Sequence, residues 1–185
     1  MEILALSGSL RTQSYNTKAL KAAASLAPDG VNLTLVDLGG VPLYREEDYA
    51  QGFPAAIEAL REAIRRSDAV LIATPEYNYS VPGVLKNAID WVSRPPDQPF
   101  ADKPLAIIGA AAGPLGTARA QYHLRQVFLF LNALVLNQPE VMIGRAHDVF
   151  DDAGHLRDEP TKERLASLLV ALVAWAERVQ PRPRS

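Results

Sequence analysis

Short apolar runs alternate with segments of helical periodicity along the whole chain. Three of these runs, at residues 3–6, 69–73 and 104–109, contain no charged side chain. Continuous apolar runs of this length are typical of strands that are buried on both faces. Such strands occur in parallel sheets that helices cover on both sides. The sequence therefore predicts an α/β fold with a parallel sheet.

The second expected strand has a different pattern. Residues 31–35 alternate apolar and polar side chains, which is typical of a strand with one face in water, at an edge of the sheet. A fifth strand is expected within residues 133–143, with an interruption at Asn137-Gln138-Pro139. An edge position for the second strand matches the order 2-1-3-4-5, so we expect a flavodoxin-like, doubly wound, five-stranded parallel sheet.

Segments of helical periodicity separate the strands, and we expect helices at residues 19–27, 57–66, 84–92, 119–131 and 160–179. The second of these has an apolar stripe, and we expect three arginines on its solvent side: Arg61, Arg65 and Arg66. Residues 38–54 read as a connection that contains glycine and proline. The run 127–131 is apolar all round its helix, so it should be buried in the fold or covered by another subunit.

We expect one domain over residues 1–185, because this length suits a single domain and no repeat or linker divides it. Only residues 181–185 should fray. The 19 Lys and Arg and the 21 Asp and Glu give a net charge of −2, which leaves no basic excess for nucleic acid. Because the chain has no cysteine, disulfides and thiolate metal sites are excluded. With no signal peptide or membrane-spanning run, we expect a cytoplasmic protein without a membrane partner.

The loop after the first strand, residues 7–16, is rich in short hydrogen-bond donors and leads directly into a helix. Amides at a helix N-terminus bind anions, and an arginine can hold two phosphate oxygens. The side-chain donors are Ser9, Arg11, Thr12, Ser14 and Asn16. The loop lacks the motifs of dinucleotide sites and P-loops, so we favour a terminal phosphate as its ligand. The alternative is an ordinary capped helix start.

The loop after the third strand, residues 74–83, is stiffened by two prolines. Tyr77 and Tyr79 offer flat faces to a planar ligand, and Asn78 can both donate to and accept from the polar edge of a heterocycle. The alternative is a rigid turn whose tyrosines pack on neighbouring helices.

The loop after the fourth strand, residues 109–117, consists mostly of small residues, which let a ligand approach the backbone. A plain turn between strand and helix is the alternative. In a 2-1-3-4-5 sheet, the loops after strands one, three and four meet where ligands bind, so we predict a site between them. The three histidines lack metal-ligand spacing and there is no G-x-S-x-G motif, so we expect neither a metal site nor a hydrolase triad.

These loops resemble those of a known family. The sequences Gly-Ser-Leu-Arg at residues 8–11 and Thr-Pro-Glu-Tyr-Asn-Tyr-Ser-Val-Pro-Gly at residues 74–83 resemble the NADPH-dependent FMN reductase family. The likeness continues through residues 85–91 and 118–125, and it is greatest to the quinone and chromate reductase branch. It covers nearly the whole chain in order.

The resemblance implies a flavodoxin-like fold with FMN bound tightly but not covalently. By matching position, the FMN phosphate would be held by Ser9, Arg11, Ser14, Tyr15 and Asn16. The isoalloxazine ring would be lined, largely through backbone groups, by Pro75, Glu76, Tyr77, Asn78 and Tyr79. Where the family often has a serine, this chain has Ala111, so a flavin contact there would have to come from the backbone. The missing hydroxyl is expected to weaken flavin binding or shift the flavin potential.

We therefore expect an NAD(P)H-dependent FMN or quinone reductase. NADPH or NADH would pass a hydride to flavin N5. A small electron acceptor, such as a quinone, chromate, an azo dye or a nitro compound, would then be reduced with ping-pong kinetics. Because the flavin carries this chemistry, we assign no catalytic side chain. The apolar fourth helix suits a homodimer, and the resemblance implies a homodimer or homotetramer.

The residues leave two other functions open. An electron-transfer flavoprotein of the flavodoxin kind would have no substrate of its own, but such carriers are usually strongly acidic and the net charge here is only −2. A doubly wound domain that binds another phosphorylated ligand would purify without colour and ignore added FMN.

Overall fold

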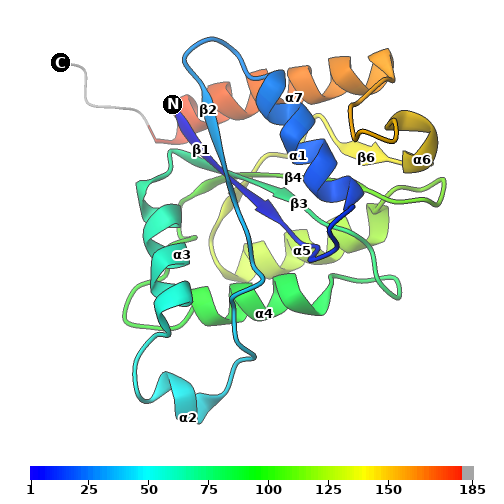
Figure 1. Cartoon of the computed structure of the whole chain (residues 1–185). Coiled ribbons are helices and arrows are strands. Elements are labelled where there is room, and N and C mark those ends of the chain that lie inside the picture. Colours follow the sequence, from blue (N-terminus) through cyan, green and yellow to red (C-terminus); the bar gives the residue numbers. More distant parts are fainter. Residues whose placement is uncertain (181–185) are drawn as a thin grey trace.

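The computed structural model describes residues 1–180, in which one parallel sheet lies between two layers of helices (Figure 1). The strands are β1 (Glu2–Ser7), β2 (Asn32–Val36), β3 (Ala69–Ala73), β4 (Pro104–Ala110), β5 (Leu134–Val135) and β6 (Val141–Ile143). Their order is β2-β1-β3-β4-β5, and β6 also pairs with β4. The predicted flavodoxin-like order is confirmed. The fifth position is shared by two short strands, which are separated where the interruption was predicted. The expected fraying of residues 181–185 lies outside the described residues.

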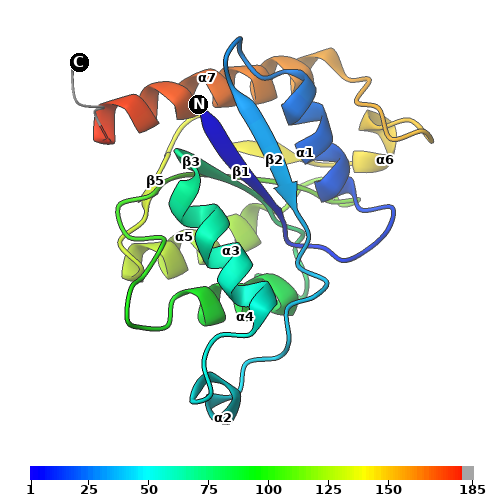
Figure 2. The ribbon, with the colours of Figure 1, turned by 60° about the vertical axis from the view of Figure 1, so that its left-hand side comes forward.

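Helices of both layers run alongside the strands (Figures 1 and 2). One face of the sheet is covered by α1 (Tyr15–Ser25) and α7 (Glu159–Val179). The other face is covered by α3 (Ala55–Arg66), α4 (Gly83–Val92) and α5 (Ala118–Phe130). Two four-residue helices, α2 (Glu46–Tyr49) and α6 (Ala146–Val149), were not predicted, because one turn is too short to show a hydrophobic period.

The burial of the strands follows their sequence patterns. Every residue of β3 and β4 is buried, as expected for strands covered on both faces. No residue of β2 is fully buried, which agrees with its place at the edge. Among residues 1–180, no helix is both long and apolar enough to cross a bilayer. The covered central strands hold their carboxyl ends, and the loops that follow them, at one edge of the sheet.

Arg61 does not lie on the solvent side of α3, and that prediction is wrong. Its side chain is 1% exposed, because position 61 falls on the same helix face as the buried Ile57 and Ile64. The guanidinium stacks on the Phe53 ring, 4.0 Å from its centroid. It also donates hydrogen bonds to the end of α4 and the loop after it, at the carbonyls of Val92, Arg94 and Asp97 and the carboxylate of Asp97. These acceptors pair the two terminal nitrogens of the guanidinium, which makes its burial tolerable. The buried Nε has no hydrogen-bond partner within residues 1–180 and lies 3.7 Å from Glu58 Oε2.

The apolar run at the end of α5 is only partly buried. Phe128 and Leu131 lie in the core, whereas Leu129 is 80% and Phe130 is 88% exposed. Burial within one chain therefore does not account for this run, and the prediction that a second subunit covers it stays open.

Candidate active site

The loops after β1, β3 and β4 enclose a cavity of about 160 Å³ at the carboxyl edge of the sheet. We call it the loop cavity. It is lined by Ser9, Arg11, Ser14, Tyr15, Asn16, Pro75, Glu76, Tyr77, Ala110, Ala111 and Ala112. The residues predicted from the resemblance all line it except Asn78 and Tyr79, and Thr12, which was predicted as a donor of the first loop, does not line it either. Ala110 and Ala112 were predicted only as part of the small-residue loop 109–117, and not as individual site residues.

One end of the loop cavity is the N-terminus of α1. Ser14 caps this helix by accepting from the Thr17 amide at 3.4 Å, and Ser9 Oγ accepts from the Arg11 amide at 3.3 Å. Both hydroxyls therefore keep their own hydrogen for a ligand. Within residues 1–180, the amides of Tyr15 and Asn16 have no hydrogen-bond partner, as is usual in the first turn of a helix. These donors, with Arg11, suit an anion.

The side chain of Asn16 joins the first loop to the end of β4. Its Nδ2 donates to the Ala110 carbonyl at 3.0 Å, and its Oδ1 accepts from the Ala110 amide at 2.9 Å. The amide group of Asn16 is buried, and one of its N–H bonds remains for a ligand.

The second loop makes a tight turn at residues 77–80. The amide of Tyr77 donates to the Ser80 carbonyl at 3.1 Å, and the amide of Ser80 donates back to the Tyr77 carbonyl at 3.0 Å. Asn78 and Tyr79 have φ angles of 50° and 67°, as a type I′ turn requires. The turn leaves both tyrosines exposed, and of the two only Tyr77 lines the loop cavity.

The carboxylate of Glu76 ties this second loop to the start of α5. It accepts from the amides of Arg119 at 3.0 Å and Ala120 at 3.2 Å, where the helix dipole favours a negative charge. It also pairs with the Arg119 guanidinium, and this hydrogen bond raises the pKa of Arg119. The guanidinium carbon lies 3.6 Å from the centroid of the Tyr79 ring. Arg119 was not predicted as a site residue, although it lies in the segment 118–125.

The third loop is held from its other side by the last residue of β6 and the segment that follows it. The Ala111 amide donates to the Ile143 carbonyl at 3.0 Å, and the Ala146 amide donates to the Ala111 carbonyl at 3.0 Å. The Arg145 amide donates to the Gly113 carbonyl at 3.1 Å. The N–H of Ala111 is therefore occupied, so of its backbone groups only the carbonyl has capacity left for a flavin.

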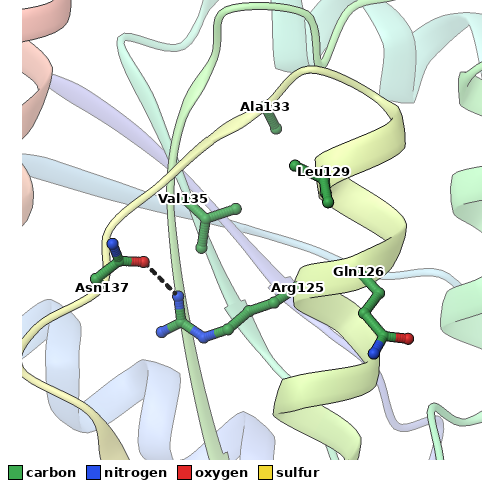
Figure 3. Close-up of a pocket in the computed structure, with 6 residues that line it drawn as sticks. All are labelled: Arg125, Gln126, Leu129, Ala133, Val135 and Asn137. Carbon is green, nitrogen blue, oxygen red and sulfur yellow. Dashed lines mark hydrogen bonds between the residues drawn. The ribbon is translucent and has the colours of Figure 1, made fainter.

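A larger groove lies away from these loops, between α5 and the segment 133–137 (Figure 3). We call it the α5 groove. Its volume is about 330 Å³, and it is lined by Arg125, Gln126, Leu129, Ala133, Val135 and Asn137. The Arg125 guanidinium donates to Asn137 Oδ1 at 3.3 Å and to the Leu136 carbonyl. It contains no convergent set of free donors, so the smaller loop cavity is the candidate active site.

Comparison with known proteins is consistent with this choice. The family model described as NADPH-dependent FMN reductase matches residues 1–148. The chain belongs to the NADPH-dependent FMN reductase family. The matched residues include all three loops of the cavity and the segment 143–146 that holds the third loop. This family uses FMN with NAD(P)H as the reductant, so the chain is an NAD(P)H-dependent reductase.

Several relatives are similar to the chain over nearly its full length. An NAD(P)H-dependent FMN reductase of Pseudomonas aeruginosa is 56% identical over 180 residues, which is 97% of each chain. A quinone reductase of Escherichia coli is 44% identical, again over 97% of each chain. Among solved structures, the NAD(P)H:(acceptor) oxidoreductase FerB of Paracoccus denitrificans has a TM-score of 0.87 and 36% identity, covering 96% of this chain and 97% of FerB.

The lining of the loop cavity fits FMN. Hydroxyls, free amides and Arg11 gather at one end and suit the phosphate, while Pro75, Tyr77 and residues 110–112 offer apolar and backbone surface to a flat ring. The enclosed volume is smaller than the ~300–1,000 Å³ of most ligand pockets. A ligand of FMN's size would therefore extend through the open mouth, with part of its ring accessible.

Proposed function

We propose that this protein is a flavin-dependent NAD(P)H:quinone oxidoreductase that reduces a small acceptor by two electrons. The observation that carries the proposal is the shape and lining of the loop cavity. It has free hydrogen-bond donors at one end, a flat apolar surface at the other end and an open mouth. The relatives named as a quinone reductase in Escherichia coli and an NADPH:quinone oxidoreductase in Arabidopsis thaliana, 44% and 42% identical, support a quinone as the acceptor.

The first loop would hold the FMN phosphate. Ser9 and Ser14 would donate through their hydroxyls, and Tyr15 and Asn16 through their backbone amides. Arg11, at the surface, would add a charge-assisted pair of hydrogen bonds. These groups orient the cofactor without taking part in electron transfer.

The other two loops would hold the ring. Residues 75–79 would lie along it mainly through their backbone, since the carboxylate of Glu76 is already bound to α5. Ala111 would contact it through its carbonyl or methyl group. When bound, FMN supplies the hydride acceptance and the two-electron transfer. We assign no acid or base to the protein.

The open mouth also defines the kinetics that we propose. NAD(P)H and the acceptor would occupy the same place beside Tyr77 in turn, which gives ping-pong kinetics. An open site selects weakly by shape, so chromate, azo dyes and nitro compounds are proposed as further acceptors. We place the reaction in the cytoplasm, which supplies NAD(P)H.

We further propose a homodimer or homotetramer. The outer face of α5 carries Leu129 and Phe130, both exposed, beside the α5 groove. Large apolar side chains that are exposed next to each other suit a surface that another subunit covers. The like face of a second copy would bury both side chains.

Initial rates test the proposed reaction. The purified protein, with FMN, NADPH and a soluble benzoquinone but no partner protein, should oxidise NADPH. Double-reciprocal plots at several quinone concentrations should be parallel. If NADPH is oxidised only when a partner redox protein is added, the protein is a flavodoxin-like carrier instead. Intersecting lines would contradict the shared site.

A further inference from the structure

The two backbone polar groups of Ala110 have no strand to pair with. Along a strand of a parallel sheet, successive residues direct their N–H and C=O to opposite neighbours. Ala111 donates toward β6, at Ile143, so Ala110 faces the side of β3. The last backbone hydrogen bond between the β3 side and β4 is made by the Thr74 amide, which donates to the Ile108 carbonyl at 2.9 Å. By the same alternation, the next amide on that side is the one of Glu76. However, β3 has already ended at Ala73, and within residues 1–180 no backbone hydrogen bond joins the loop after it to Ala110.

The side chain of Asn16 takes the place of the missing strand residue. Its amide group presents one donor and one acceptor, as a backbone peptide does, and both bond to Ala110 at 3.0 and 2.9 Å. Asn16 and Ala110 are both buried. Without this side chain, two buried polar groups would be left unpaired at the end of β4.

We infer that Asn16 is a positioning residue that fixes the spacing between the phosphate end and the ring end of the loop cavity. This inference rests on the proposed function. The side chain of Asn16 starts in the first turn of α1, where the phosphate would bind, and ends on Ala110, next to the ring-lining residues 111–112. A cofactor of fixed length needs both ends at their correct separation. When the geometry of a site is already formed before the ligand binds, ordering the site costs less free energy during binding.

Riboflavin has the ring system of FMN but lacks its phosphate. Comparing the affinities of the protein for the two flavins therefore shows whether the Asn16 side chain positions the loops or contacts the phosphate. In Asn16→Leu, the backbone amide at position 16 stays but the pair with Ala110 is lost. We expect both flavins to bind more weakly by the same factor, about tenfold, in fluorescence-quenching titrations. Arg11→Gln should weaken FMN alone. Thr17→Val, which removes the hydrogen bond to Ser7 Oγ one position further along α1, is the matched control and should weaken neither.

Each outcome decides the inference. A loss confined to FMN would make the Asn16 side chain a phosphate ligand, and no loss at all would make it irrelevant to the site; either result overturns the proposal. If the wild-type protein binds no FMN, the proposed function fails instead.

Hydrogen exchange of the Ala110 amide in the flavin-free wild-type protein gives a readout that does not depend on any variant folding. Slow exchange, comparable to that of the β4 interior, is expected if the pair is formed before the flavin binds. Protection that appears only after FMN is added would contradict a preset spacing.

Discussion

Replacing Arg61 with methionine should cost a large part of the stability of this fold. Methionine retains much of the apolar stem but leaves the carbonyls of Val92, Arg94 and Asp97 without their donor. Each lost hydrogen bond contributes about 1 kcal/mol, and the contact of the guanidinium with Phe53 adds ~1 kcal/mol. We therefore expect a loss of about 4 kcal/mol, a substantial share of the ~5–15 kcal/mol that holds a typical domain folded.

Arg65 provides the matched control, one helical turn further along α3. Its side chain is 32% exposed and pairs with Glu58, Glu62 and Asp97 at the surface, so Arg65→Met should cost no more than ~1 kcal/mol. Urea unfolding of both variants measures the difference as a shift in midpoint with an unchanged slope. Equal losses in the two variants would refute the argument that burial and the backbone carbonyls, and not charge alone, give Arg61 its role.

Three further variants test the second loop, an acidic side chain near the C-terminal helix and the exposed end of α5. Glu76→Gln removes the negative charge that pairs with Arg119 and that connects the second loop to α5, so FMN should bind about fivefold more weakly in fluorescence titrations. An unchanged affinity would show that this ion pair does not fix the conformation of the second loop. Hydrogen bonds, first that from the His155 amide, lower the pKa of Asp151 from 3.8 to about 2. The stabilisation that the Asp151 carboxylate gives to the folded state is therefore complete above about pH 4, and it is lost as the pH falls toward 2. The urea midpoint of Asp151→Asn should lie below that of the wild type at neutral pH and meet it near pH 2; a constant difference would contradict this. Replacing both Leu129 and Phe130 with serine should convert a sedimenting dimer or tetramer into smaller species, and an unchanged sedimentation coefficient would exclude that interface.

The strands were predictable because the burial of each strand follows from its own short sequence pattern. The run 69–73 has no polar residue and lies in the centre of the sheet, and the alternation at 31–35 marks the edge strand. The order of the strands then identified the loops that meet at the carboxyl edge. Nine of the predicted site residues line one cavity there for this reason.

The roles of several side chains could not be predicted, because their partners are distant in sequence. Asn16 bonds to a residue 94 positions away, and Glu76 to the start of a helix 43 positions away. Arg61 reads as a surface residue until the loop after α4 supplies its acceptors. Polar residues of these types suit both a ligand site and a structural hydrogen bond, and only the three-dimensional arrangement separates the two.

We propose above all that the loop cavity holds an FMN that NAD(P)H can reduce. The most direct test is the visible absorption spectrum of the purified protein, supplied with FMN if needed, before and after NADPH is added without oxygen. We predict a protein-bound flavin band that bleaches after the addition. No bound flavin after FMN is supplied would contradict the cofactor assignment, and a bound flavin that does not bleach would contradict the reductase assignment.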